Sequence, residues 1–165
     1  MNNDCLYFRL TNPFNKTDFA APQDFFIRIV RPHSFSFHDI MWNIFSFGKY
    51  REYQLVQKLD GRIVSTAQVM PKIFIFQFMQ KNKTLHIGPC ATVKEFRGRG
   101  FYPLLLTTIM NDFKDKINLF YIFCDKTNVS SKRGIEKAGF NAFGEGYKNR
   151  FGIYVLDKVY RNKSC

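Results

Sequence analysis

The fold of this chain is decided by the stretch Val93-Lys94-Glu95-Phe96-Arg97-Gly98-Arg99-Gly100-Phe101-Tyr102-Pro103. It joins an apolar, strand-like run over residues 85–93 to a helix-like run over residues 102–117. Gly98 and Gly100 remove side chains at the place where the backbone must turn sharply. The stretch therefore predicts a strand, a tight glycine turn and a helix in immediate succession.

The backbone amides of this turn can point into one cup at the start of the helix. Amide groups gathered at a helix N-terminus bind phosphate. By itself, a short loop of this kind is also consistent with a plain strand-to-helix turn carrying two solvated arginines. The amides and the two positive side chains that would form the cup belong to Arg97, Gly98, Arg99, Gly100, Phe101 and Tyr102.

The rest of the sequence predicts an α+β protein with a mixed sheet. Residues 1–24 are rich in turn residues and are expected to hold at most a short element. The order of the other elements predicts an antiparallel N-terminal part and one parallel pair of strands around the 102–117 helix. By apolar periodicity, we expect strands over residues 25–30, 52–58, 63–69, 73–79, 85–93, 119–124, 140–147 and 151–159, and helices from 34 or 36 to 46 and over 102–117 and 128–138.

A second segment, residues 128–140, reads Asn-Val-Ser-Ser-Lys-Arg-Gly-Ile-Glu-Lys-Ala-Gly-Phe. Together the two segments resemble the GNAT superfamily of acyl-CoA-dependent N-acyltransferases. The family's loop motif, Arg/Gln-x-x-Gly-x-Gly/Ala, is met at Arg97 and Gly100 but has Tyr102 in place of a small residue. The later signature, Asn-x-x-Ala/Ser followed by Glu-Lys-x-Gly-Phe, is met at Asn128, Ser131, Glu136, Lys137, Gly139 and Phe140.

This resemblance covers about residues 85–140, and two partial motifs in the right order are more specific than either alone. The sequence around the loop also resembles GNAT members found in bacterial surface-polysaccharide gene sets. We expect one acetyltransferase domain over residues 1–165, with an acceptor-side half over 1–80 and an acetyl-CoA-binding core over 85–140.

The GNAT resemblance implies a sheet in which the two parallel strands splay apart and hold the pantetheine arm of acetyl-CoA. It implies that Asn128 contacts this arm, although Asn is equally suited to cap a helix. An inward-turned Tyr102 would crowd the pyrophosphate. The residues that the resemblance assigns to acetyl-CoA are Cys90, Ala91, Thr92, Arg97, Gly98, Arg99, Gly100, Phe101, Tyr102, Asn128 and Ser131.

His86 is the candidate general base, because it stands where several GNAT members carry a catalytic glutamate. A histidine with an unperturbed pKa of about 6.5 suits this task, and the rate is then expected to rise through that pKa. The alternative is a structural histidine on a strand. His33 and His38 lie in the helical region that would wall the acceptor site, and they are further candidates.

The family's usual proton donor to the leaving thiolate, a tyrosine, is replaced here by Ile135. We therefore expect solvent, Tyr102 or Tyr147 to supply that proton. Nothing in the sequence pairs Cys90 with a base, so direct attack by the amine is expected rather than acyl transfer through the cysteine.

Composition limits the function classes. The net charge of +12 favours anionic ligands such as coenzyme A, and its even spread argues against a nucleic-acid-binding arm. The four cysteines form no Cys-x-x-Cys pair, so we expect no metal site and reduced thiols in the cytoplasm. No apolar run reaches the roughly 20 residues of a membrane span, and no signal peptide is recognisable.

These observations predict an N-acetyltransferase that moves an acetyl group from acetyl-CoA to the primary amine of a small molecule. An amino sugar, free or nucleotide-linked, is the leading candidate for the acceptor. The alternatives are a peptide or protein amine and a non-catalytic acyl-CoA-binding module. Assembly as a homodimer is left open.

Overall fold

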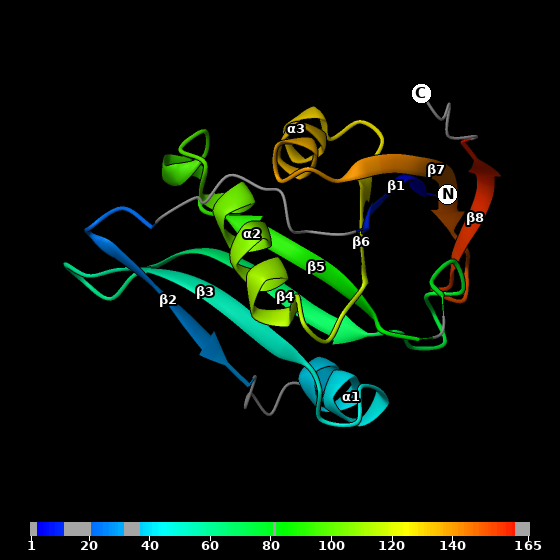
Figure 1. Ribbon diagram of the computed structural model, residues 1–165, viewed down its shortest axis with the longest axis horizontal. Helices are drawn as coiled ribbons and strands as arrows, with labels where there is room; N and C mark the ends of the chain where they lie inside the picture. Colours follow the sequence, from blue (N-terminus) through cyan, green and yellow to red (C-terminus); the bar gives the residue numbers. More distant parts are fainter. Residues whose placement is uncertain (1–2, 12–20, 32–36, 81, 161–165) are drawn as a thin grey trace.

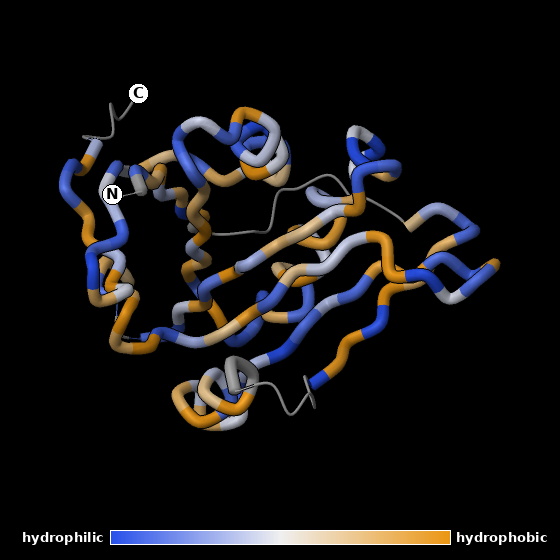
Figure 2. Tube along the Cα trace, turned by 180° about the vertical axis from the view of Figure 1, so that it is seen from behind, coloured by the Kyte–Doolittle hydropathy of each residue, from blue (hydrophilic) through white to orange (hydrophobic). Residues whose placement is uncertain are grey.

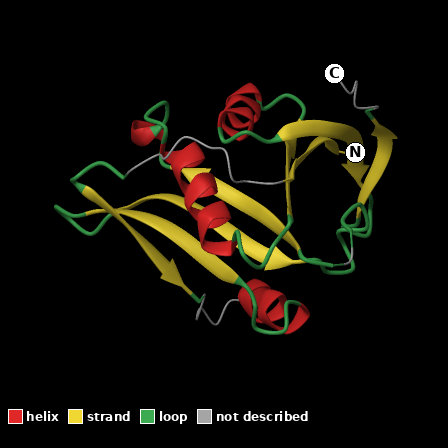
Figure 3. Ribbon diagram, viewed as in Figure 1, coloured by secondary structure: helices red, strands yellow, loops and turns green. Residues whose placement is uncertain are grey.

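The computed structural model describes residues 3–11, 21–31, 37–80 and 82–160. Eight strands form one mixed sheet in the order β2-β3-β4-β5-β6-β1-β7-β8, with helices packed against it (Figures 1 and 3). The strands are β1 (Asn3–Thr11), β2 (Phe25–Val30), β3 (Arg51–Gln57), β4 (Ile63–Pro71), β5 (Thr84–Thr92), β6 (Leu119–Asp125), β7 (Asn141–Lys148) and β8 (Tyr154–Val159). The helices are α1 (Phe37–Phe45), the short 3-10 turn η2 (Lys94–Phe96), α2 (Phe101–Phe113) and α3 (Val129–Lys137).

The α+β prediction and most of the predicted elements are confirmed. The strand–turn–helix unit forms β5, η2 and α2, although α2 ends at Phe113 rather than at Ile117. The second motif forms α3, which ends at Lys137 and is closed by Gly139 with a φ of 87°. The serines predicted to begin the first helix lie outside the described residues.

The prediction for residues 1–24 is wrong, because β1 is a nine-residue strand inside the sheet, between β6 and β7. Tyr7 and Phe8 are completely buried on opposite faces of that strand. A strand covered on both faces reads as a continuous apolar run and not as an alternating one. The apolar run of β1 is short, and the turn residues that follow it dominate the composition of residues 1–24.

The prediction of a strand over residues 73–79 is also wrong. Two backbone hydrogen bonds fold the segment into successive turns: the Phe76 amide donates to the Ile73 carbonyl oxygen (3.0 Å), and the Met79 amide donates to the Phe76 carbonyl oxygen (3.2 Å). Ile73, Phe76 and Met79 are buried, whereas Phe74 is 60% exposed. The apolar side chains thus face the sheet every third residue, which is the period of a turn and not that of a strand.

The parallel pair opens into a cleft. β5 pairs with β6 only from Thr84 to His86, opposite Leu119 to Tyr121. Beyond this point β5 stays paired with β4, and β6 stays paired with β1 along its full length. The backbone of β5 after His86 and that of β6 after Tyr121 therefore face each other without pairing, and Figure 1 shows the two strands diverging.

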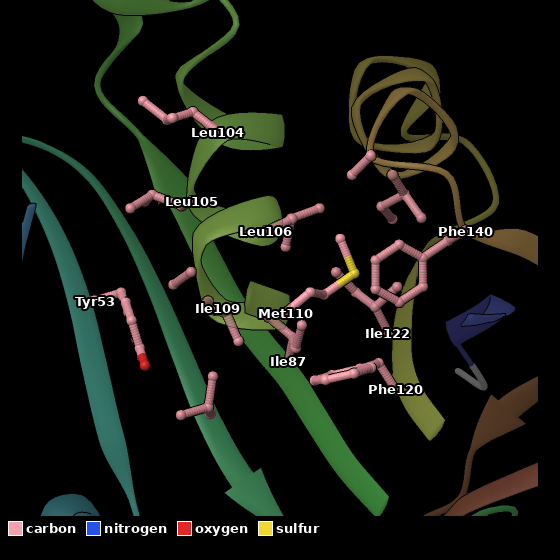
Figure 4. Close-up of a cluster of buried hydrophobic side chains, with 14 of the residues drawn as sticks. Tyr53, Ile87, Leu104, Leu105, Leu106, Ile109, Met110, Phe120, Ile122 and Phe140 are labelled. Atoms are coloured by element: carbon pink, nitrogen blue, oxygen red, sulfur yellow. The ribbon is translucent and has the colours of Figure 1, made fainter. Parts of the chain in front are cut away.

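Two apolar clusters hold the sheet. The first lies under α2 and α3, where Leu105, Leu106 and Ile109 are completely buried against β3–β6 (Figure 4). The second lies on the opposite face and consists mainly of aromatic rings from β1, β6, β7 and the 73–79 segment. The hydrophobic helix α1 (Figure 2) packs Trp42 and Phe45 against this second cluster. Each face of the sheet thus carries its own core.

Candidate active site

The glycine turn lines a cavity of about 600 Å³, here called the loop cavity. Gly98 and Gly100 have φ angles of 77° and 81°, in the left-handed region that favours glycine. A Cβ atom built on either glycine would meet no other heavy atom within 4 Å. The two glycines therefore leave open space beside the N-terminus of α2, as a phosphate-binding cup requires.

Ten of the eleven residues predicted to contact acetyl-CoA line the loop cavity. Arg97 is one of them, and its Nε donates a hydrogen bond of 3.0 Å to the carbonyl oxygen of Thr92. Arg99 is the exception, because its guanidinium lies over the ring of Phe96, 5.1 Å from the centroid, and does not line the cavity. Phe96 itself lines the cavity and was not predicted.

Sequence reasoning also missed two cations of α3, Arg133 and Lys137, which line the same cavity. They stand four positions apart and therefore lie on one face of the helix. The four-residue spacing could therefore have identified this pair from the sequence. With Arg97, they place positive charge on both sides of the cavity, which favours an anionic ligand.

Asn128 caps α3. Its side-chain oxygen accepts hydrogen bonds from the backbone amide of Ser131 at 3.0 Å and from the Ser130 hydroxyl at 2.9 Å. The capping role proposed for this residue is therefore confirmed. Asn128 also lines the loop cavity, so the two roles are compatible.

A second cavity, of about 480 Å³, lies across the cleft and is called here the aromatic cavity. Its walls include Trp42 of α1, Phe76 of the 73–79 segment, Phe123 of β6 and Tyr154 of β8. The two cavities meet at the residues that line both of them, which are Cys90, Tyr102, Asn128 and Ser131.

Tyr102 turns toward α3 at this junction. A Cβ at Gly134 would lie only 2.5 Å from a ring carbon of Tyr102, so the ring packs where α3 has no side chain. The Tyr102 hydroxyl interacts electrostatically with the side chains of Cys90 and Ser131, which line the same junction. Burial raises the pKa of the Tyr102 hydroxyl above its usual value and that of the Cys90 thiol to about 12. Both groups are therefore protonated at neutral pH, and Cys90 is a poor nucleophile.

His86 lies in the wall of the aromatic cavity and is only 2% exposed. Its imidazole ring is 4.2 Å from the ring of Phe76 and stacks on Phe123 at 4.9 Å, measured between centroids. Neither ring nitrogen has a hydrogen-bond partner among the described residues. An unpartnered buried polar group is costly, so its presence beside a cavity indicates a ligand group.

The expectation that His86 titrates near pH 6.5 is wrong. Burial lowers the pKa of this imidazole to about 3, because the charged form loses its hydration and gains no counter-ion. The ring is therefore neutral at physiological pH. His33 lies outside the described residues, as does the side chain of His38.

The described part of the chain contains no group of three or more potential metal-ligating side chains. None of the described helices is long and apolar enough to cross a membrane.

The sequence matches the model of the acetyltransferase (GNAT) family over residues 18–140, which is more than half of the chain. The chain belongs to the GNAT family. Members of this family are acyl-CoA-dependent N-acetyltransferases. No curated protein matches the chain significantly.

Solved GNAT structures share this fold at low sequence identity. A GCN5-related N-acetyltransferase from Sphaerobacter thermophilus has a TM-score of 0.67 and 15% identity over 87% of this chain and 49% of its own. A tandem GNAT protein from the clavulanic acid biosynthesis pathway has a TM-score of 0.63 and 13% identity over 88% of this chain and 52% of its own. This GNAT chain thus spans about half the length of both proteins.

A glucosamine N-acetyltransferase region in a fungal multi-domain GH3 β-N-acetylglucosaminidase has a TM-score of 0.58 and 11% identity. The match covers 87% of this chain and 20% of the fungal one.

Proposed function

We propose that this chain is an N-acetyltransferase that moves an acetyl group from acetyl-CoA to the primary amine of a small molecule. The observation that supports this proposal is the meeting of the two cavities in the cleft between β5 and β6. The loop cavity, with its glycines and cations, fits the phosphates of coenzyme A. The aromatic cavity, whose described lining contains no such cluster of cations, fits the acceptor. The thioester then belongs at their junction.

At this junction the reaction is a direct displacement. The amine nitrogen attacks the acetyl carbonyl carbon and forms the C–N bond, and the C–S bond then breaks with its electron pair on sulfur. The unpaired backbone of β5 offers amide groups to the developing oxyanion. The proton of the amine passes to water, so the products are the amide and the free thiol.

Two side chains have roles in this scheme. Neutral His86 accepts a hydrogen bond from the amine and orients its lone pair toward the cleft. Tyr102 donates its hydroxyl proton to the departing sulfur and is reprotonated from solvent. The usual tyrosine position is taken by Ile135, which is completely buried and has no proton to give. If Tyr102 did not supply this proton, the isoleucine at the usual tyrosine position would favour the alternative of a non-catalytic acyl-CoA-binding module.

An amino sugar is our leading acceptor, as in the biosynthesis of a bacterial surface polysaccharide. The rings of the aromatic cavity offer flat faces on which a sugar ring can stack. The fungal region of similar fold is described as acting on glucosamine. A peptide or protein amine is the alternative acceptor. A reducing compartment, which we propose to be the cytoplasm, suits the free thiols of Cys90 and Cys124.

Acetyl-CoA is expected to raise the melting temperature and to support release of free thiol with a suitable amine. A ligand at a hundred times its dissociation constant adds about 2.7 kcal/mol to the free energy of unfolding. Differential scanning fluorimetry measures the first effect, and a thiol-reactive dye measures the second across a panel of amines. A thermal shift with no turnover of any amine would support the binding module, and no shift at millimolar acetyl-CoA would contradict both functions.

Tyr102→Phe is expected to lower turnover by about a hundredfold, at the lower end of the range for the loss of a general acid. The affinity for acetyl-CoA should stay near that of the wild type, because the ring still packs on Gly134. Tyr147→Phe is the matched control, since Tyr147 lines neither cavity. Steady-state kinetics measure the turnover, and calorimetric titration measures the affinity for acetyl-CoA. Equal turnover of the two variants would remove Tyr102 from the reaction.

A further inference from the structure

From the composition of the aromatic cavity we infer its substrate class: a weakly basic primary amine on a flat ring, bound in its neutral form, rather than an alkylammonium such as a lysine side chain. This inference rests on the proposed acetyl transfer and narrows its acceptor. It follows from three features of the cavity, which are its rings, its charges and the position of His86.

The rings that line the aromatic cavity come from four separate parts of the fold. Phe76 and Tyr154 lie 5.7 Å apart, and Tyr154 and Phe123 lie 4.2 Å apart, between ring centroids. Met70 and Ile75 add aliphatic surface. A volume of about 480 Å³ with such walls suits a small ligand that presents a flat, largely apolar face.

The charges at this cavity do not favour a cation. Asp125 is the one acidic residue in its described lining, and a carboxylate oxygen of Asp125 already accepts hydrogen bonds from the amide (2.8 Å) and the hydroxyl of Thr127. Lys148 is the one residue in that lining with a positive charge, and its ammonium lies over the ring of Tyr154 at 5.4 Å. The lysine occupies an aromatic face that a substrate ammonium would otherwise use.

The amine must reach the cleft with a free lone pair, because an ammonium cannot attack a carbonyl. His86 stands between the rings of Phe76 and Phe123 and opposite Met70 of β4, and none of these carries a negative charge that would offset the lost hydration of an imidazolium. The pKa of about 3 reflects the same enclosure. The other titratable side chains that line the cavity are Cys5, Cys90, Tyr102, Cys124, Asp125, Lys148 and Tyr154, and none of them contributes to that pKa.

His86 is thus a hydrogen-bond acceptor for a neutral amine and not a base that can take a proton from an alkylammonium with a pKa of about 10.4. Amines whose neutral fraction at pH 7 is far larger than that of an alkylamine are those with electron-withdrawing neighbours. Arylamines and 2-amino sugars belong to this class, whereas lysine side chains and polyamines do not. The structure therefore favours the amino sugar of the proposed function over the protein amine.

The test compares four acceptors with the wild-type protein and acetyl-CoA between pH 6 and 9: glucosamine, aniline, cyclohexylamine and Nα-acetyl-lysine amide. Aniline and cyclohexylamine match in ring size and differ in basicity. At pH 7, we expect the kcat/KM of the best weakly basic amine to exceed that of the lysine derivative by about tenfold or more. The kcat/KM of cyclohexylamine should rise about tenfold per pH unit with its neutral fraction, and that of aniline should be flat.

A lysine derivative that is preferred at pH 7, or a cyclohexylamine profile that reaches a plateau near pH 7, would overturn the inference and leave acetyl transfer intact. Either result would mean that the protein accepts the ammonium and deprotonates it. Absence of thiol release with every amine, in a protein that binds acetyl-CoA, would instead contradict the proposed function itself. The pH profiles therefore separate the two failures.

Discussion

Gly100→Val is expected to abolish measurable acetyl-CoA binding while the protein remains folded. The valine side chain would project into the open space of the loop cavity, where Gly100 now has nothing within 4 Å of its Cβ position. It would also resist the φ of 81° at the start of α2. Loss of two charge-assisted hydrogen bonds at about 1.5 kcal/mol each lowers the affinity by about two orders of magnitude. Isothermal titration calorimetry measures this change.

Gly61→Val is the matched control for this experiment. Gly61 has a φ of 70° and also has no neighbouring heavy atom within 4 Å, but it lies in the β3–β4 turn and lines neither cavity. The backbone strain should cost both variants about 1–2 kcal/mol of stability. Only Gly100→Val should lose acetyl-CoA. If both variants bind acetyl-CoA like the wild type, the glycine turn is a structural connection and no phosphate site.

His86→Phe is expected to lower turnover by about tenfold to a hundredfold, because the amine loses the hydrogen bond that orients it, and to make the protein more stable. The free energy of unfolding should rise by about 1 kcal/mol, because an unsatisfied buried polar group is replaced by an apolar ring among Phe76 and Phe123. Kinetics and urea denaturation measure the two effects. A histidine kept for structure would give the opposite sign of the stability change.

The pH dependence of stability provides a second measurement on the same variant. The folded-state pKa of His86, about 3, lies below the ordinary value of 6.5. Protonation of His86 therefore favours the unfolded chain. The contribution of the neutral imidazole to the free energy of unfolding is fully present above about pH 6.5 and is lost as the pH falls toward 3. The loss approaches about 1.4 kcal/mol per pH unit, and His86→Phe should lack this contribution.

Thr84→Val is the control on the same face of β5. It removes a buried hydroxyl that donates a hydrogen bond of 2.9 Å to the carbonyl oxygen of Gln80, outside both cavities. This change should lower stability by about 1 kcal/mol and leave turnover unchanged. Full activity in His86→Phe would remove His86 from the reaction.

The elements that sequence reasoning predicted correctly depend on local chemistry. The left-handed φ angles of Gly98 and Gly100 and the cap made by Asn128 are requirements of a few adjacent residues. The two wrong predictions depend on distant partners. Whether the 73–79 segment forms a strand or turns is decided by the sheet face that Phe76 covers, and no neighbour in sequence reveals that face.

The same distinction applies to the candidate site. The glycine turn follows from the first motif, and most residues of the loop cavity were predicted, although Phe96, Arg133 and Lys137 were not. The neutral state of His86 was not, because it is set by Phe123, which lies on another strand, and by Phe76, ten residues earlier in a segment read as a strand. The orientation of Tyr102 was left open, because it depends on the missing side chain of Gly134 on another helix.

The position of β1 in the sheet has a consequence for the way the chain folds. β1 pairs Thr11 with Leu119 and Cys5 with Asp125, and on its other edge it pairs Asn3 with Lys148. Its partners are thus synthesised more than a hundred residues later, and such distant pairings make folding slow. During synthesis, the nine residues of β1 emerge first and stay unpaired while β2–β5 and α2 assemble. The β6–β1–β7 side of the cleft therefore forms only after residues 119–148 have emerged from the ribosome, and until then the nascent chain is exposed to aggregation.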